Sequence, residues 1–197
     1  AWPIIEPGVD YVDNWHVHFI ATHLTAITDK VILEDGTLYN RLLINVIPGA
    51  MKSLLTNVFW PAWEWGPRHM PHLRYIESPW YQRLWPHVKL TGDQNEKKKF
   101  ENTATGFRQA VASTTITGAR GDRVVIDDPL SVTDALSETV KNSTNTWFCE
   151  AVPSRLVSPK ESAIVVIMQR LAEDDTSGVI LDKGMPYDHI MLPMRYD

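Results

Sequence analysis

The residues best suited to chemistry lie in the segment Arg41 to Ser53, RLLINVIPGAMKS. Its apolar run breaks at Pro48-Gly49 and is followed by Lys52-Ser53, the order expected for a strand, a phosphate-binding loop and a helix start. In such a loop, backbone N–H groups and the helix N-terminus hold phosphate oxygens, the lysine neutralises the β- and γ-phosphates, and the hydroxyl ligates Mg²⁺. Lys52 is therefore a candidate phosphate ligand, and Ser53 is a candidate magnesium ligand.

The match to the pattern GxxxxGK[ST] is incomplete. Counting back from Lys52 places Val46 and Met51 at the two positions that are normally glycine, which leaves Gly49 as the only glycine of the loop. The segment also fits an ordinary strand, turn and helix in which Lys52 is a solvated surface charge. Under the functional interpretation, the cofactor-binding residues of this segment are Pro48, Gly49, Ala50, Met51, Lys52 and Ser53.

A second candidate element is the acidic pair Asp127-Asp128, directly after the apolar run Arg123 to Ile126. Open α/β sheets place ligands at the carboxyl ends of their strands, so this pair has the form of a Walker B element. Asp127 would hold the Mg²⁺ that Ser53 ligates, and Asp128 would orient or deprotonate the attacking water. The sequence Asp-Asp-Pro is also a good turn or helix cap. Because aspartate is one methylene shorter than the glutamate common at this position, we expect slow turnover.

A third candidate is the pair Gln169-Arg170, which follows the apolar run Ala163 to Met168. A carboxamide can both donate to a γ-phosphate and accept from water, so Gln169 is a candidate phosphate sensor. Taken alone, the pair is an ordinary polar strand end. Three apolar runs that each deliver suitable polar side chains to one sheet edge are much less expected by chance.

The elements that must position these residues form an α/β pattern. Short continuous apolar runs are typical of strands covered on both faces. Besides the run before Pro48, they predict the strands Arg123–Ile126, Ala163–Met168 and His189–Leu192. One helix is predicted from about Asn14, a second after Ser53 with a kink or end at Pro61, and a third near Pro79 to Leu84. A β-hairpin is predicted over Phe100 to Ala112. We expect one domain over residues 1–197 with a mostly parallel sheet flanked by helices, as in the P-loop NTPases of the ASCE type.

The composition sets further limits. With 197 residues, 44% hydrophobic and 22% charged, the chain is long enough for one domain with a full core. No apolar run approaches the ~20 residues of a membrane span, so we expect a soluble, cytosolic protein. The lone Cys149 permits no internal disulfide. A net charge of −5 provides no basic surplus, so any grip on DNA must be local, shared among subunits or supplied elsewhere.

Nearly the whole chain resembles the ATPase domain of phage large terminase subunits, the motors that drive DNA into preformed capsids. The resemblance rests on the combination of DNWHVHFIATHLTAIT, LLINVIPGAMKSLLTNVFWPAWEWGP, FENTATGFRQAVASTTITGARGDRVVIDDPLSVTDALSETV and VVIMQRLAEDDTSGVI. It implies ATP and Mg²⁺ as cofactors. The family's nucleotide-binding, catalytic and coupling roles would fall on Gly49, Lys52 and Ser53, on Asp127 and Asp128, and on Gln169 with Arg170.

The resemblance also implies partners and further site residues. Double-stranded DNA, a portal protein and a small terminase subunit would be partners of a homo-oligomeric ring in the host cell cytoplasm, with no membrane involved. Trp15 and His16 fall in the segment that resembles the family's adenine-contacting region, although Trp15 equally fits a core residue. Arg120, ahead of Arg123, is the candidate arginine finger, in cis or from a neighbouring subunit, and such residues are worth ~10³ to 10⁵ in rate.

Two departures from the family pattern matter. The family usually has a strand and a helix between the helix after the phosphate loop and the segment SPWYQRLWP, which RHMPHLRYIESPW joins here in few residues. Either a βα unit is deleted, or part of the natural chain is missing from this sequence. The family's RNase H-like nuclease domain is not among these residues, so DNA cleavage is not predicted. Three alternatives stay open: a helicase-like ATPase, a small-molecule kinase, and a non-catalytic assembly module.

Overall fold

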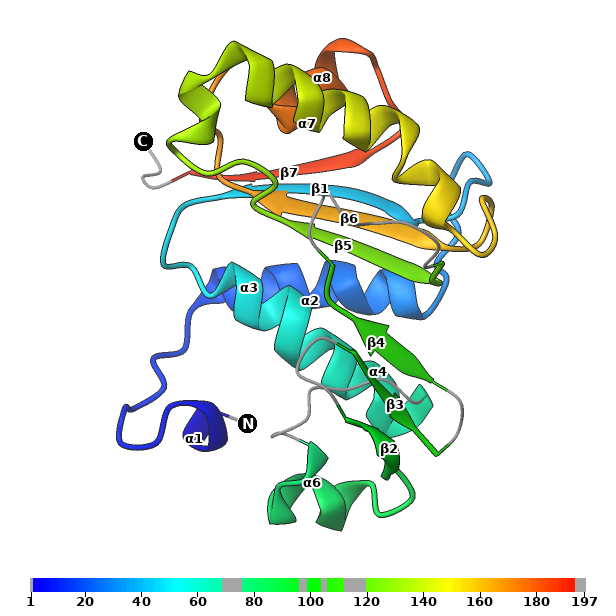
Figure 1. Ribbon diagram of the computed structural model, residues 1–197. Helices are drawn as coiled ribbons and strands as arrows, with labels where there is room; N and C mark the ends of the chain where they lie inside the picture. The colour runs from blue at the N-terminus through cyan, green and yellow to red at the C-terminus, as the bar shows by residue number, and fades with distance from the viewer. Residues whose placement is uncertain (1, 69–75, 96–98, 104–105, 112–119, 194–197) are drawn as a thin grey trace. The chain divides into compact units, whose positions relative to one another are not determined.

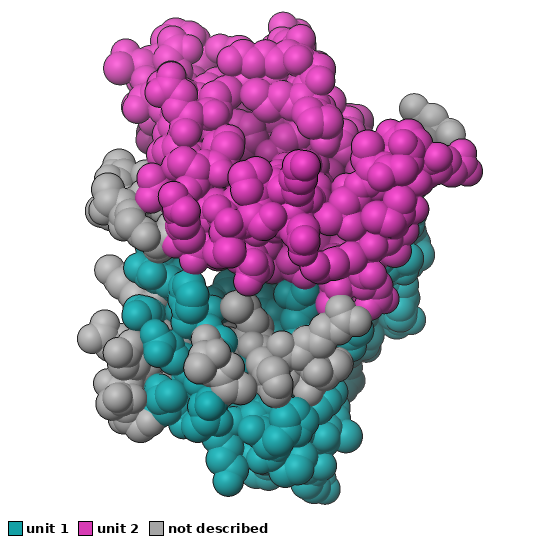
Figure 2. All heavy atoms as spheres, turned by 90° about the vertical axis from the view of Figure 1, so that its right-hand side faces the viewer, with its two compact units in different colours: residues 1–24, 53–111 teal, residues 25–52, 112–197 magenta. Residues whose placement is uncertain are grey.

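A computed structural model describes residues 2–68, 76–95, 99–103, 106–111 and 120–193 (Figure 1). The contacts divide the chain into two compact units (Figure 2). Unit 1 comprises Ala1–Leu24 and Ser53–Val111, and unit 2 comprises Thr25–Lys52 and Ala112–Asp197. The candidate loop, the acidic pair and Gln169 all belong to unit 2, whereas Ser53 begins the second segment of unit 1.

Unit 2 is built on a parallel four-stranded sheet with the strand order β5-β6-β1-β7. The strands are β1 (Arg41–Val46), β5 (Arg123–Asp127), β6 (Ala163–Met168) and β7 (Asp188–Leu192). The expected parallel sheet is thereby confirmed, with each strand within one residue of its predicted bounds where these were stated. Because β6 pairs with both β1 and β5, the loops that leave these three strands are neighbours at one edge of the sheet.

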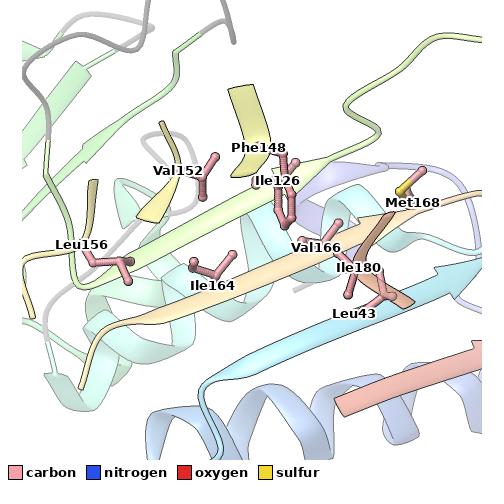
Figure 3. Packing of buried hydrophobic residues seen from close by; sticks show 9 residues of the cluster. All are labelled: Leu43, Ile126, Phe148, Val152, Leu156, Ile164, Val166, Met168 and Ile180. Carbon is pink, nitrogen blue, oxygen red and sulfur yellow. The ribbon is translucent and has the colours of Figure 1, made fainter. Parts of the chain in front are cut away.

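Burial explains why these runs form central strands. Every residue of β6 is buried, as is every residue of β1 after Arg41, so both faces of these strands are covered. One face packs beneath α7 (Glu138–Glu150) and α8 (Thr176–Asp182), as Figure 1 shows. Figure 3 shows the core on that side, made of Leu43, Ile126, Phe148, Val152, Leu156, Ile164, Val166, Met168 and Ile180.

Short helical turns connect the strands of unit 2. After β5 the chain passes through η3 (Asp134–Leu136) into α7, whose N-cap Ser137 accepts the Val140 N–H. The turn η4 (Pro153–Arg155) leads on to β6, and α8 joins β6 to β7. The described part of the chain adds no strand beyond β5, and residues 69–75, within the segment that departs from the family pattern, lie outside it.

Unit 1 contains most of the remaining elements. These are α1 (Trp2–Ile5), most of α2 (Trp15–Thr28), η1 (Leu55–Phe59), α4 (Trp60–Arg68), α6 (Pro79–Leu84), β2 (Leu90–Asn95), β3 (Lys99–Asn102) and β4 (Phe107–Gln109). The three strands form an antiparallel sheet, which confirms the predicted hairpin. The helices predicted from about Asn14 and near Pro79 are also present. A small core of Ala62, Ile76, Tyr81 and Val88 holds this unit together.

The prediction that Pro61 kinks or ends the helix after the candidate loop is wrong about where the irregularity lies. The helix begins as α3 (Lys52–Leu54), widens into the π-helical turn η1 and continues through Pro61 to Arg68. The Trp60 N–H bonds to the Leu55 carbonyl, five residues back. Because the wider turn directly precedes Pro61, the missing N–H of proline falls where the regular bonding ladder is already interrupted.

Candidate phosphate-binding site

The loop between β1 and α3 contains two residues with a left-handed backbone conformation. Gly49 has φ +80° and Met51 has φ +57°, both in the left-handed region that favours glycine. Met51 therefore holds a glycine-like conformation at one of the pattern's glycine positions, at a cost of about 1–2 kcal/mol. Val46, at the other glycine position, is the last residue of β1 and is buried. At this position of the pattern, the chain is therefore still part of the strand β1.

Lys52 is buried and ion-paired, so the interpretation of Lys52 as a solvated surface charge is wrong. The residue is only 9% exposed, and its Nζ lies 2.8 Å from Asp128 Oδ2. A buried ammonium is strongly unfavourable unless it is paired, which makes this contact a defining feature of the loop. Within the loop itself, Pro48 and Gly49 are exposed and Ala50 is buried.

Asp128 lies where the ends of three strands meet. Its backbone N–H donates to the Ile167 carbonyl at 3.0 Å, and its φ of +43° turns the chain sharply after β5. Its Oδ1 accepts the Gln169 N–H at 3.1 Å, while Oδ2 contacts Lys52. The side chain therefore joins the loop after β1 to the start of the loop after β6, which a simple turn or helix cap would not do.

Asp127 ends β5 next to Asp128, opposite Ile167 of β6, and is partly buried. No group of three or more His, Cys, Asp or Glu residues is placed to hold a metal ion anywhere in the described ranges. Mg²⁺ is commonly held by one or two protein oxygens together with phosphate oxygens and waters, and a carboxylate with a hydroxyl provides such oxygens. The metal roles of Asp127 and Ser53, the second residue of α3 and exposed, stay predictions.

Arg170 is occupied by its own loop, a role the sequence did not indicate. Its guanidinium donates to the carbonyls of Ala172 and Glu173, each at 3.2 Å, and its Nε lies 3.4 Å from Asp175 Oδ1. Gln169 reaches the site through its backbone N–H. The two residues therefore make different contacts: the Gln169 N–H bonds to Asp128, and the Arg170 side chain bonds within the β6–α8 loop.

Asp175 is a structural residue that the sequence pattern did not single out. It is 0% exposed, and its carboxylate accepts the N–H groups of Leu171, Ala172 and Gly178 as well as contacting Arg170. The signal was available, because an aspartate just before Thr-Ser-Gly in a helix start is a good N-cap. Its carboxylate holds both the end of the β6–α8 loop and the first turn of α8.

Replacing Asp175 by alanine should lower the free energy of unfolding by about 3 kcal/mol, because buried N–H groups lose their acceptor. Urea unfolding followed by circular dichroism measures the change. Asp35→Ala is the matched control, since the Asp35 carboxylate also accepts two hydrogen bonds, both from Thr37, but at an exposed position. Equal losses in the two variants would contradict the structural role of Asp175.

A second buried polar network lies beneath α8. Asn45 of β1 is 3% exposed, and its Oδ1 accepts the Ser177 hydroxyl and contacts His189 Nε2, both at 2.8 Å. Its Nδ2 donates to the Met168 carbonyl at 3.4 Å. Because the amide oxygen only accepts, His189 carries a proton on Nε2. Burial and the charge of Arg170 lower the pKa of His189. The network links β1, β7 and α8 near the candidate site.

His189 should make unfolding depend on pH. Since its pKa is lower in the folded than in the unfolded chain, the unfolded chain binds more protons near and below about pH 6.5. The free energy of unfolding should therefore have its highest value at about pH 7.5 and decrease as the pH is lowered to about 5.5. In His189→Gln, which keeps a hydrogen-bond donor, this fall should be smaller. Urea midpoints across that range measure it, with exposed His87→Gln as control, and an unchanged slope in His189→Gln would refute it.

Trp15 and His16 lie at the start of α2 in unit 1. Trp15 is 51% exposed, so its interpretation as a core residue is wrong. Its ring lies against Phe19, with centroids 6.1 Å apart, and edge-on to His16 at 6.3 Å. An exposed indole is available for stacking on a base. Adenine contact by either residue stays a prediction.

The arginine-finger candidates lie at or before the start of β5, at the opposite end of the strand from Asp128. Arg123 begins the strand and Asp127 ends it, about 13 Å away at about 3.3 Å per residue. Gly121, next to Arg120, pairs with Leu156, which fixes this segment near the amino end. Neither arginine is therefore adjacent to Asp128 along the strand. Arg120 is exposed, and its action in cis or on a neighbouring subunit stays a prediction.

Compared with known proteins, the chain matches no protein-family model and no curated protein sequence. The terminase resemblance therefore stays a hypothesis about this chain. Among the helices that the structure describes, none has the length and apolar character needed to cross a bilayer.

Proposed function

We propose that this chain is a Mg²⁺-dependent P-loop ATPase that serves as the motor domain of a viral DNA-packaging terminase. The observation that carries the ATPase proposal is the 2.8 Å ion pair between Lys52 and Asp128. These residues follow β1 and β5, which are separated by β6. A lysine just after a glycine-like turn would contact the phosphates, and a carboxylate just after a strand would orient or deprotonate the attacking water.

The ion pair suggests how the site changes on nucleotide binding. Lys52 forms an ion pair with Asp128 that offsets the charge of the carboxylate. The β- and γ-phosphates would compete with Asp128 for the Lys52 ammonium. If the ammonium contacted the phosphates instead, Asp128 Oδ2 could accept a proton from water. Oδ1 would stay oriented by the Gln169 N–H. Bound Mg²⁺, held by Ser53 and Asp127, would neutralise charge on the phosphate oxygens.

The motor assignment rests on the family resemblance. Its partners would be double-stranded DNA, a portal protein and a small terminase subunit, with several copies of the chain in a ring. With a net charge of −5, a DNA grip would have to be local, shared among subunits or supplied elsewhere. A ring would also bring Arg120 of one chain to the site of its neighbour.

A non-catalytic nucleotide-binding or assembly module is the second candidate. The specific observation in its favour is that Lys52 and Asp128 already satisfy one another, as a structural ion pair would. The short aspartate side chain at position 128 also favours slow or absent turnover.

Release of inorganic phosphate from ATP separates these proposals. The ATPase proposal predicts Mg²⁺-dependent release to water, abolished by a chelator and increasing more than linearly with chain concentration if a neighbour completes the site. Tight nucleotide binding without release would support the assembly module. Transfer of phosphate to an added acceptor would indicate a kinase, and absence of both binding and release would refute every nucleotide-based proposal.

A further inference from the structure

The loop between β6 and α8, residues 169–175, determines how Asp128 is oriented. Its first residue, Gln169, donates its backbone N–H to Asp128 Oδ1 at 3.1 Å. A shift of this loop would therefore move or release one of the two carboxylate oxygens. The rate of a catalysed reaction is sensitive to such shifts, since a misplacement of a reacting group by ~1 Å can lower the rate ~10²-fold.

The loop is held together by hydrogen bonds between its own residues. Arg170 binds the carbonyls of Ala172 and Glu173 from inside, and Asp175 binds the backbone of Leu171 and Ala172. The loop is attached to β6 at one end and to α8 at the other, and a contact from a third element would further fix its position relative to Asp128.

Such a contact comes from α7. The Lys141 side chain is 6% exposed, and its ammonium lies 2.7 Å from each carboxylate oxygen of Asp174 in the loop. It lies equally close to Glu138, one turn earlier in α7. Asn145 adds a bond to the Asp174 carbonyl at 2.9 Å and accepts the Thr176 hydroxyl at 3.1 Å. The Lys141 side chain is thus nearly buried, whereas the side chains of Asp174 and Glu138 are 54% and 74% exposed.

The same helix is connected to Asp128 along the chain. Between Asp128 and α7 lies a compact segment in which the Ser131 hydroxyl donates to Asp134 at 2.7 Å, followed directly by η3. The chain from Asp128 to Lys141, the ion pair to Asp174, and the loop back to Gln169 form a closed circuit. Lys141 is therefore placed to set the distance between the loops that follow β5 and β6.

We propose that Lys141 and Asp174 are a positioning pair that holds the β6–α8 loop so that Gln169 orients Asp128 for attack on ATP. Neither residue is catalytic, because each acts on Asp128 only through Gln169. The catalytic part of this inference rests on the proposed ATPase function, whereas the part that concerns the orientation of Asp128 does not. Loss of the pair should lower kcat and leave KM for ATP unchanged.

The chain offers a matched pair of variants. Asp174→Ala and Glu138→Ala each remove one carboxylate from Lys141, but only Asp174 connects Lys141 to the loop. Without nucleotide, we expect Asp174→Ala to speed hydrogen exchange of the Gln169 amide at least about tenfold. It should also lower kcat about tenfold with KM unchanged. Glu138→Ala should change neither quantity, and Asp174→Glu should recover most of both.

Several results would overturn the inference. Wild-type exchange at Gln169 in Asp174→Ala would do so, as would equal effects of Asp174→Ala and Glu138→Ala. A rise in KM with kcat unchanged would also do so, because it would indicate a role in binding. If the wild-type chain fails to hydrolyse ATP, only the ATPase proposal fails. Hydrogen exchange of the Gln169 amide would still decide whether Lys141 and Asp174 position the loop.

Discussion

Lys52→Ala should abolish Mg²⁺-dependent ATP binding, raising the Kd by about 10²-fold or more. Lys52 is the first residue of α3 and carries the only side-chain charge from Ile47 to Leu54, and a charge-assisted contact to phosphate is among the strongest that a side chain makes. The alanine variant also leaves the Asp128 carboxylate without its 2.8 Å partner, and its negative charge would then repel the phosphates. Isothermal titration calorimetry with ATP and Mg²⁺ measures the loss.

Two further variants separate binding from folding in this experiment. The double variant Lys52→Ala with Asp128→Asn removes both charges, so it should recover stability while ATP binding stays lost. Lys30→Ala is the matched control, because Lys30 also forms a 2.7 Å ion pair, with Glu161, but both partners are exposed. Unchanged nucleotide affinity in Lys52→Ala would count decisively against a phosphate site at this loop.

Asp128→Asn should keep ATP binding and lose turnover, with kcat lowered about 10²- to 10⁴-fold. Asparagine has nearly the same shape, and its amide oxygen can still accept the Gln169 N–H. The amide cannot take a proton from water, so the loss should fall on kcat alone. Single-turnover phosphate release measures the chemical step, and calorimetry measures the affinity separately.

The control for this variant is Asp134→Asn, which makes the same change in the exposed segment after Asp128. We expect wild-type turnover from it. Hydrolysis at the wild-type rate by Asp128→Asn would remove Asp128 from the role of base. Loss of binding together with turnover would instead indicate that Asp128 mainly holds Lys52 in place.

The sheet could be predicted because its strands are covered on both faces. Such strands are continuous apolar runs, and the residues that follow them fall at one edge by the geometry of parallel strands. The strand order could not be predicted in the same way. That β6 lies between β1 and β5 depends on packing between distant segments, and this order is what brings Gln169 to Asp128.

The features that could not be predicted have local physical causes. The loop pattern counts glycines, but the backbone conformation decides, and Met51 takes the left-handed conformation without being glycine. Arg120 is close to Asp127 in sequence, yet a fully extended strand separates them in space. Asp175 and Lys141 look like solvated charges in a polar stretch, and only the packing of α7 and α8 buries them. Burial of charged residues is set by tertiary contacts that one sequence does not display.

The most direct test is titration of the folded wild-type chain with a non-hydrolysable ATP analogue and Mg²⁺, followed by calorimetry. We expect saturable binding of one analogue per chain that weakens markedly when Mg²⁺ is chelated. Absence of saturable binding at millimolar analogue, in a chain that still unfolds cooperatively, would contradict the proposal that Lys52 and Asp128 serve a nucleotide.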